Sequence, residues 1–153
     1  MTHSERTPSR SVEATENAAG KLAESLHAGD VVLLEGDLAA GKTTFVRGLL
    51  EGLGGSSSDV SSPTFVLLQT YDCEDHQIRR VHHVDLYRLS NGVADLREVG
   101  LSEVLSDTEA VVAVEWPKDT LATWIPTDAR VWRVAITIEK DDARSIEITP
   151  PEG

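Results

Sequence analysis

Residues 36–43 have the spacing G-x-x-x-x-G-K-[ST], which is typical of a phosphate-binding loop. Phosphate oxygens need several hydrogen-bond donors at close range, and successive backbone N–H groups at a helix N-terminus supply them. Gly36 and Gly41 allow the backbone to approach closely, Lys42 is expected at the β- and γ-phosphates, and the Thr43 hydroxyl is expected on Mg²⁺. The predicted nucleotide-binding residues of this stretch are Asp37, Leu38, Ala39, Ala40, Gly41, Lys42, Thr43 and Thr44.

The segments on either side of this loop have the character that a phosphate-binding loop requires. The apolar run Val31–Leu34 before it predicts a buried parallel strand. After it, apolar residues recur at helical spacing, namely Phe45, Val46, Leu49, Leu50 and Leu53. A loop between a buried strand and a helix is the context in which this motif binds phosphate rather than forming an ordinary turn.

Two acidic residues are predicted near the same edge of the sheet. Glu115 follows the apolar strand Ala110–Val114, and ligands of open α/β sheets lie at the carboxyl ends of strands. Asp85 stands near the end of a second strand, where a carboxylate can face Mg²⁺. Position alone leaves alternatives open, because Asp85 could be a surface or strand-end residue and Glu115 a helix N-cap. Trp116 could stack near the nucleotide or simply pack.

The remaining periodic segments predict the elements that hold the site. Residues 11–27 predict a helix with Ser11 as its N-cap, residues 65–71 and 78–87 predict an antiparallel hairpin, and residues 95–105 predict a short helical region. Residues 131–148 predict a C-terminal hairpin in which we expect no chemistry. The fold class is therefore α/β, a three-layer P-loop NTPase with a small mixed sheet and antiparallel β-hairpin additions.

Three further features have both a functional and a structural interpretation. The polar, proline-containing loop around Ser62 and Thr64 is either a flexible connector or a switch loop that senses the γ-phosphate or Mg²⁺. His82 and His83 are adjacent on a strand, so they point to opposite faces and cannot chelate one ion together, which favours packing or hydrogen-bonding roles. Cys73 is interpreted as an incidental surface thiol.

Composition limits the possible functions. The chain has 153 residues and a formal net charge of −12, without the basic stripe of a nucleic-acid-binding protein, so direct and independent binding of RNA or DNA is not expected. We predict a disordered tail at residues 1–10 and a single domain at residues 11–150. A single cysteine, no apolar run of spanning length and no leader-like N-terminus predict a cytoplasmic protein that does not enter a membrane.

Taken together, these segments resemble the TsaE (YjeE) family of small bacterial ATPases. The resemblance extends from residue 11 to the final hairpin. Beyond the phosphate loop, it rests on Ser62-Pro63-Thr64-Phe65, on His83-Val84-Asp85-Leu86-Tyr87-Arg88-Leu89, on Gly100-Leu101 and on Val114-Glu115-Trp116-Pro117. The Asp-Leu-Tyr-Arg-Leu and Glu-Trp-Pro blocks are much more specific than the loop.

The resemblance implies roles that spacing alone leaves open. It implies an ATP- and Mg²⁺-dependent ATPase that supports threonylcarbamoyladenosine modification of tRNA next to the anticodon, acting on partners of the TsaB and TsaD type rather than performing the transfer. Lys42, Asp85 and Glu115 would be catalytic, with Thr43, Asp85 and Glu115 on the metal. Thr15 and Trp116 would lie near the nucleotide, and Ser62 and Thr64 in the switch loop.

The sequence departs from the family pattern at two positions. Ala39 stands where the family usually has glycine, and at a positive φ an alanine would cost about 1 kcal/mol, which would weaken rather than abolish nucleotide binding. Val84 stands where the family often has an aromatic residue, a difference that is expected to change packing only.

Other functional classes are compatible with the same loop. They are a small-molecule phosphotransferase (kinase), a GTPase switch, and a scaffold that binds nucleotide without turnover. For a phosphotransferase, the sequence lacks an arginine-rich lid. For a GTPase, it lacks the Asn/Thr-Lys-x-Asp segment that binds guanine, because residues 139–142 have the lysine and the aspartate but begin with glutamate.

Overall fold

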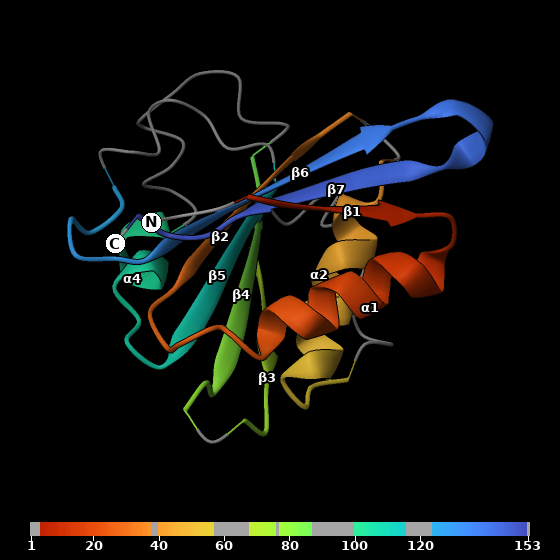
Figure 1. Cartoon of the computed structure of the whole chain (residues 1–153). Coiled ribbons are helices and arrows are strands. Elements are labelled where there is room, and N and C mark those ends of the chain that lie inside the picture. Colours follow the sequence, from red (N-terminus) through yellow and green to blue (C-terminus); the bar gives the residue numbers. More distant parts are fainter. Residues whose placement is uncertain are drawn as a thin grey trace.

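A seven-stranded mixed sheet forms the centre of the molecule, which we describe from a computed structural model (Figure 1). The structure describes residues 4–37, 40–56, 68–75, 77–86, 100–115 and 124–152. The strands lie in the order β1-β7-β6-β2-β5-β4-β3. Their bounds are β1 Glu5–Ser9, β2 Val31–Gly36, β3 Leu68–Asp72, β4 Arg80–Asp85, β5 Ala110–Glu115, β6 Val131–Ile138 and β7 Arg144–Thr149.

The four central strands run parallel to one another, because β4 pairs with β5, β5 with β2 and β2 with β6 in the same direction. In that register Leu34 and Asp85 both lie opposite Glu115. The carboxyl ends of β2, β4 and β5 therefore meet at one edge of the sheet. The strands β1, β7 and β3 are antiparallel to their neighbours and complete the two sides.

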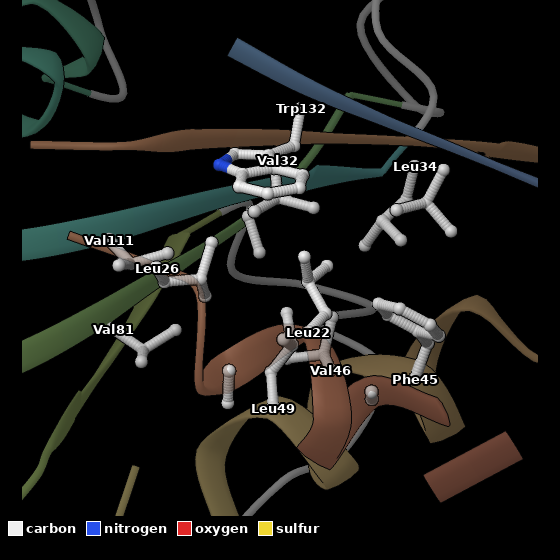
Figure 2. Close-up of a cluster of buried hydrophobic side chains, with 14 of the residues drawn as sticks. Leu22, Leu26, Val32, Leu34, Phe45, Val46, Leu49, Val81, Val111 and Trp132 are labelled. Atoms are coloured by element: carbon white, nitrogen blue, oxygen red, sulfur yellow. The ribbon is translucent and has the colours of Figure 1, made fainter. Parts of the chain in front are cut away.

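Helices cover both faces of the sheet, which gives the predicted three layers (Figure 1). The helices α1 (Val12–Ala23) and α2 (Lys42–Gly52) pack on one face, and α4 (Leu101–Leu105) packs on the other. Alternation along β2 separates the two cores, since Val32 and Leu34 face α1 and α2 while Val31 and Leu33 face α4. Figure 2 shows the larger core, with Trp132 and Val32 from the sheet above Leu22 and Val46 from the helices.

Small residues allow α1 and α2 to approach closely. A Cβ atom built at Gly48 of α2 would lie 2.5 Å from the backbone oxygen of Glu16 and 2.8 Å from the Cβ of Ala19. One turn later, a Cβ at Gly52 would lie 2.8 Å from that of Ala23. The pairing of these helices places the start of α1 beside the start of α2, and so beside the phosphate loop.

The N-terminal segment differs from the prediction of a disordered tail at residues 1–10, which is wrong for Glu5–Ser9. These residues form β1, which pairs antiparallel with β7 from Glu5↔Ile148 to Ser9↔Arg144. Four of the five are exposed, so no apolar alternation in the sequence marked the strand. Pro8, which has no N–H to donate, is tolerated because β1 is an edge strand.

Several other predicted elements are confirmed within the described residues. Ser11 caps α1 by accepting a hydrogen bond from the Ala14 amide at 3.0 Å, although the helix ends at Ala23 rather than at residue 27. β3 and β4 form the predicted antiparallel hairpin, and β6 and β7 form the C-terminal one. Among the described segments, no helix has the length and apolar character needed to cross a bilayer.

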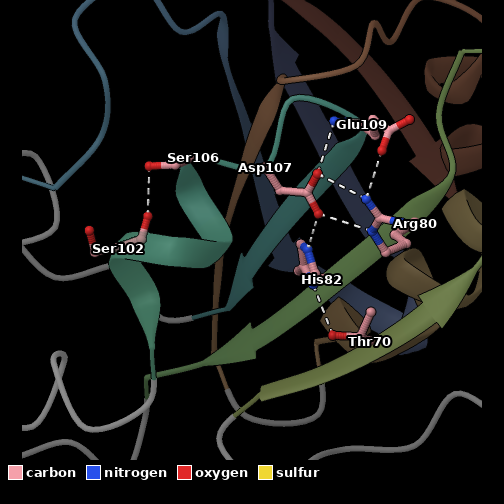
Figure 3. A network of polar contacts seen from close by, with 7 residues as sticks. All are labelled: Thr70, Arg80, His82, Ser102, Ser106, Asp107 and Glu109. Atoms are coloured by element: carbon pink, nitrogen blue, oxygen red, sulfur yellow. Dashed lines mark hydrogen bonds and ion pairs between the residues drawn. The ribbon is translucent and has the colours of Figure 1, made fainter.

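A polar network lies at the amino ends of β4 and β5, at the opposite edge of the sheet from the loop (Figure 3). His82 hydrogen-bonds to Thr70 through Nδ1 at 2.9 Å and to Asp107 through Nε2 at 2.8 Å. Arg80 donates to both oxygens of Asp107, at 3.0 and 3.2 Å, and to Glu109. This confirms the hydrogen-bonding role predicted for His82.

This network makes stability depend on pH through Asp107. Hydrogen bonds from Arg80 and His82 hold the pKa of the Asp107 carboxyl well below its ordinary value. The stabilisation is therefore present above the ordinary aspartate pKa of about 4 and is lost as the pH falls towards the lower native value. We expect Asp107→Asn to lower the melting temperature at pH 7, and the difference from the parent chain to shrink in melts below pH 4. The exposed Asp128→Asn should show no such trend, and a constant difference for Asp107→Asn at every pH would contradict the assignment.

Cys73 is half-buried against the larger core rather than a simple surface thiol. Burial, with Asp75 and Asp72 nearby, raises the pKa of this thiol to about 11. Because the thiolate is the reactive form, we expect iodoacetamide at pH 8 to alkylate the native chain about 100-fold more slowly than the urea-unfolded chain. The native rate should rise about tenfold per pH unit from pH 8 to 10 and level off above the pKa of the thiol. Equal native and unfolded rates at pH 8, followed by mass spectrometry, would contradict this expectation.

Candidate functional site

The phosphate loop joins β2 to α2 and is shaped by two glycines. Gly36 has φ +156°, and a Cβ there would lie 2.6 Å from the backbone oxygen of Ile136 on the neighbouring strand β6. Gly41 has φ +112° and precedes the first residue of α2. Both conformations strongly favour glycine. The loop therefore turns sharply from the end of β2 into the N-terminus of α2, where backbone N–H groups favour an anion.

Lys42 is folded back onto the loop. Its Nζ donates to the carbonyl oxygens of Gly36 at 2.6 Å and Asp37 at 2.9 Å, and only 5% of the residue is exposed. Burial lowers the pKa of the Lys42 ammonium, and the negative charges of Glu115, Asp85 and Asp37 oppose this shift. An ammonium group already held at the loop by two carbonyl groups, with three negative charges acting on it, is close to where a bound phosphate would lie.

Thr43 and Glu115 are brought together from positions 72 residues apart. The Thr43 hydroxyl donates to Oε2 of Glu115 at 3.2 Å, and Glu115 is 3% exposed. Asp85 lies directly opposite Glu115 in the parallel register of β4 and β5. In the structure, Glu115 and Asp85 therefore lie at the same edge of the sheet as the loop, as the sequence predicts.

This set of side chains suits Mg²⁺. Mg²⁺ prefers oxygen ligands, and in nucleotide sites it takes few of them from protein and the rest from phosphate and water. The Thr43 hydroxyl and the carboxylates of Glu115 and Asp85 are such ligands. The residues described here contain no group of three or more histidine, cysteine or acidic side chains that would enclose an ion by themselves.

Thr15 lies beside the loop although it is 21 or more residues away in the chain. It is 4% exposed, and its Oγ1 hydrogen-bonds to the Ser9 Oγ at 2.7 Å. A Cβ built on Gly41 would lie 3.9 Å from the Thr15 Cγ2. The position that the family resemblance gave to Thr15 is thus compatible with contact to a bound nucleotide.

Arg144 is a residue that sequence reasoning missed. Its Nε donates to the carbonyl oxygen of Ala40 at 3.0 Å, across 104 positions of sequence. It is the first residue of β7, where it pairs with Ser9 of β1 on one side and with Ile138 of β6 on the other. The C-terminal hairpin, in which no chemistry is expected, therefore supports the loop through this hydrogen bond. The sequence carries no signal for it, since an arginine after a turn is common.

The predicted site residues fall into three groups. Lys42, Thr43, Glu115 and Asp85 converge, and Ala40 and Gly41 belong to the loop. Asp37 contributes its backbone carbonyl to Lys42 and its charge to the local field, while Thr44 is half-buried on α2. The predictions for Leu38, Ala39, Ser62, Thr64 and Trp116 lie outside the described residues.

Comparison with known proteins agrees with this geometry. The family model for threonylcarbamoyl adenosine biosynthesis protein TsaE matches residues 9–146. The chain belongs to the TsaE family. Among its relatives, a Streptomyces coelicolor protein named tRNA threonylcarbamoyladenosine biosynthesis protein TsaE is 47% identical over 96 residues, 63% of this chain and 62% of the relative. That match thus spans under two thirds of the relative's length.

Other relatives match over more of their length. A Rickettsia bellii protein with the same name is 37% identical over 139 residues, 91% of this chain and 90% of the relative. The crystal structure of YdiB from Bacillus subtilis superposes with a TM-score of 0.69 at 28% identity and covers 99% of this chain and 88% of that one. The predicted α/β P-loop NTPase fold is confirmed by this likeness, as is membership of the TsaE family.

Proposed function

We propose that this TsaE-family chain is a Mg²⁺-dependent ATPase that supports threonylcarbamoyladenosine modification of tRNA beside the anticodon. The observation that carries the proposal is the convergence of Lys42, the Thr43 hydroxyl and Glu115 where the phosphate loop enters α2. This combination of a cation, a metal-binding hydroxyl and a carboxylate suits a nucleoside triphosphate with its ion.

The side chains have separate tasks in this proposal. Lys42 leaves the carbonyls of Gly36 and Asp37 and binds the β- and γ-phosphates, since a phosphate oxygen is a stronger acceptor than a carbonyl. Thr43, Glu115 and Asp85 would hold Mg²⁺, which would supply positive charge to neutralise the phosphate oxygens. Glu115 or Asp85 also orients the attacking water. Arg144 keeps the loop in shape from the C-terminal hairpin.

The residues outside the described segments complete the proposal as predictions. Ser62 or Thr64 senses the γ-phosphate or Mg²⁺, and Trp116 lies near the nucleotide, as does Thr15 of the described helix α1. Leu38 and Ala39 contribute backbone amides to the loop.

The chain would act with other proteins rather than on tRNA directly. With a net charge of −12 it repels the phosphate backbone, so we assign tRNA binding and the transfer step to partners of the TsaB and TsaD type. The ATP cycle would reset that complex between turnovers, in the cytoplasm. The names of the relatives, which refer to tRNA threonylcarbamoyladenosine biosynthesis, support this pathway.

The test is phosphate release from ATP by the purified chain, with and without Mg²⁺, alone and then with the TsaB–TsaD complex and tRNA. We expect slow, Mg²⁺-dependent release that the complex stimulates. Tighter binding of GTP than ATP, or phosphate transfer to a small acceptor, would contradict the proposal. No release in the presence of the complex would leave a nucleotide-binding scaffold instead of an ATPase.

A further inference from the structure

His83 is the fully buried neighbour of Glu115. It lies on β4 with 0% of its surface exposed, and its Nε2 hydrogen-bonds to Oε2 of Glu115. The same oxygen accepts the hydroxyl of Thr43. The three residues therefore form a chain from the inside of the sheet to the first turn of α2, with Glu115 in the middle.

Burial of this imidazole is not explained by packing. Alternate residues of β4 share one face, so His83 points to the same side as Val81, which belongs to the apolar core under α1 and α2. Within the described part of the chain, its Nδ1 is the buried side-chain atom that has no hydrogen-bond partner. Leaving a buried polar atom without a partner is unfavourable, and a leucine or methionine would fill the space without that cost.

Within the described residues, the polar contact that the His83 side chain makes is its hydrogen bond to Glu115. An ionised carboxylate only accepts, so the proton of this hydrogen bond belongs to Nε2 of His83. Glu115 has a flexible side chain and a competing cation close by, because its charge acts on Lys42. A donor fixed on the sheet holds the carboxylate towards Thr43.

We propose that His83 is a positioning residue that fixes the Glu115 carboxylate beside the Thr43 hydroxyl and so sets how strongly Mg²⁺ increases nucleotide affinity. This inference rests on the proposed function, because it assumes that Thr43 and Glu115 share the ion. Hydrogen bonds to metal-ligating side chains commonly act in this way, since they orient the ligand before the ion arrives. His83 itself touches neither nucleotide nor metal.

The test compares two replacements of similar length that differ in the donor. His83→Gln keeps an N–H group near the position of Nε2, whereas His83→Met has none. The dissociation constant of a non-hydrolysable ATP analogue is measured by calorimetry with Mg²⁺ and with EDTA, and the ratio of the two values is the Mg²⁺ effect. We expect His83→Met to reduce this effect by about 10-fold or more, as for other supporting residues of metal ligands, and to leave the affinity in EDTA nearly unchanged. His83→Gln should retain most of it.

His82→Gln is the matched control. His82 is the neighbouring buried histidine, it also hydrogen-bonds to a carboxylate, and it faces the other side of the sheet. Its replacement should lower the melting temperature but leave the Mg²⁺ effect as in the parent chain. A purely structural role for His83 would make the two histidine positions behave alike.

Each outcome has a definite meaning. A parental Mg²⁺ effect in His83→Met, or equal losses in His83→Met and His83→Gln, would overturn the positioning role. If His83→Met does not fold, His83→Asn replaces it, because the shorter amide does not extend to the Nε2 position, and a parental effect there would overturn the inference equally. No Mg²⁺ effect in the parent chain would instead refute the proposed function.

Discussion

Replacing Lys42 by alanine should reduce the affinity for ATP by about 100-fold or more. A lysine that binds both the β- and γ-phosphates contributes two charge-assisted hydrogen bonds, each stabilising by about 1.5–3 kcal/mol, and 2.7 kcal/mol already corresponds to about 100-fold. In the ligand-free chain the same ammonium is held at 2.6 and 2.9 Å by the carbonyls of Gly36 and Asp37. It is therefore already at the loop and needs only to exchange acceptors.

Calorimetric titration with ATP and Mg²⁺ measures this loss. Lys21→Ala, on the exposed side of α1, removes the same charge far from the loop carbonyls and should bind as the parent chain does. Thermal melts of both variants show whether the fold survives, since Lys42→Ala also leaves two loop carbonyls without their donor. Unchanged ATP affinity in a folded Lys42→Ala would show that the loop does not bind the phosphates.

Gly48→Ala should be the most destabilising small substitution in the helical layer, lowering the free energy of unfolding by about 2–3 kcal/mol. The new methyl group would lie 2.5 Å from the Glu16 backbone oxygen and 2.7 Å from its Cα, and neither atom belongs to a side chain that can rotate away. The two helices would have to separate. Because α1 carries Thr15 to the loop and α2 begins with Lys42, we also expect weaker nucleotide binding.

Gly20→Ala is the matched control in the facing helix. Among the described residues, a Cβ at Gly20 would have only the Gly48 oxygen within 4 Å, at 4.0 Å, which is ordinary contact. There the intrinsic preference of alanine over glycine in helices, about 1 kcal/mol, should stabilise the protein slightly. Urea denaturation of both variants should therefore give shifts of opposite sign. Shifts of the same sign and size would mean that helix propensity, rather than the close approach of α1 and α2, determines how these glycines affect stability.

The sequence by itself determined those parts of this protein that depend on residues close together in the chain. The phosphate loop is a contiguous motif, and its flanking strand and helix follow from apolar runs at periods set by backbone geometry. The Ser11 cap and the two hairpins were predicted for the same reason, since capping and alternation act over a few residues. The edge at which Asp85 and Glu115 meet the loop followed from a general property of parallel sheets.

Only the tertiary structure decided the contacts between distant segments. β1 is a polar segment that becomes a strand because β7 offers it an edge, and nothing in its own residues shows this. The hydrogen bonds from Arg144 to Ala40 and from His83 to Glu115 depend on strand order and register. A single sequence does not specify which strands become neighbours, because many pairings bury the same apolar residues. The support behind the loop and the acids is therefore visible only when the sheet is assembled.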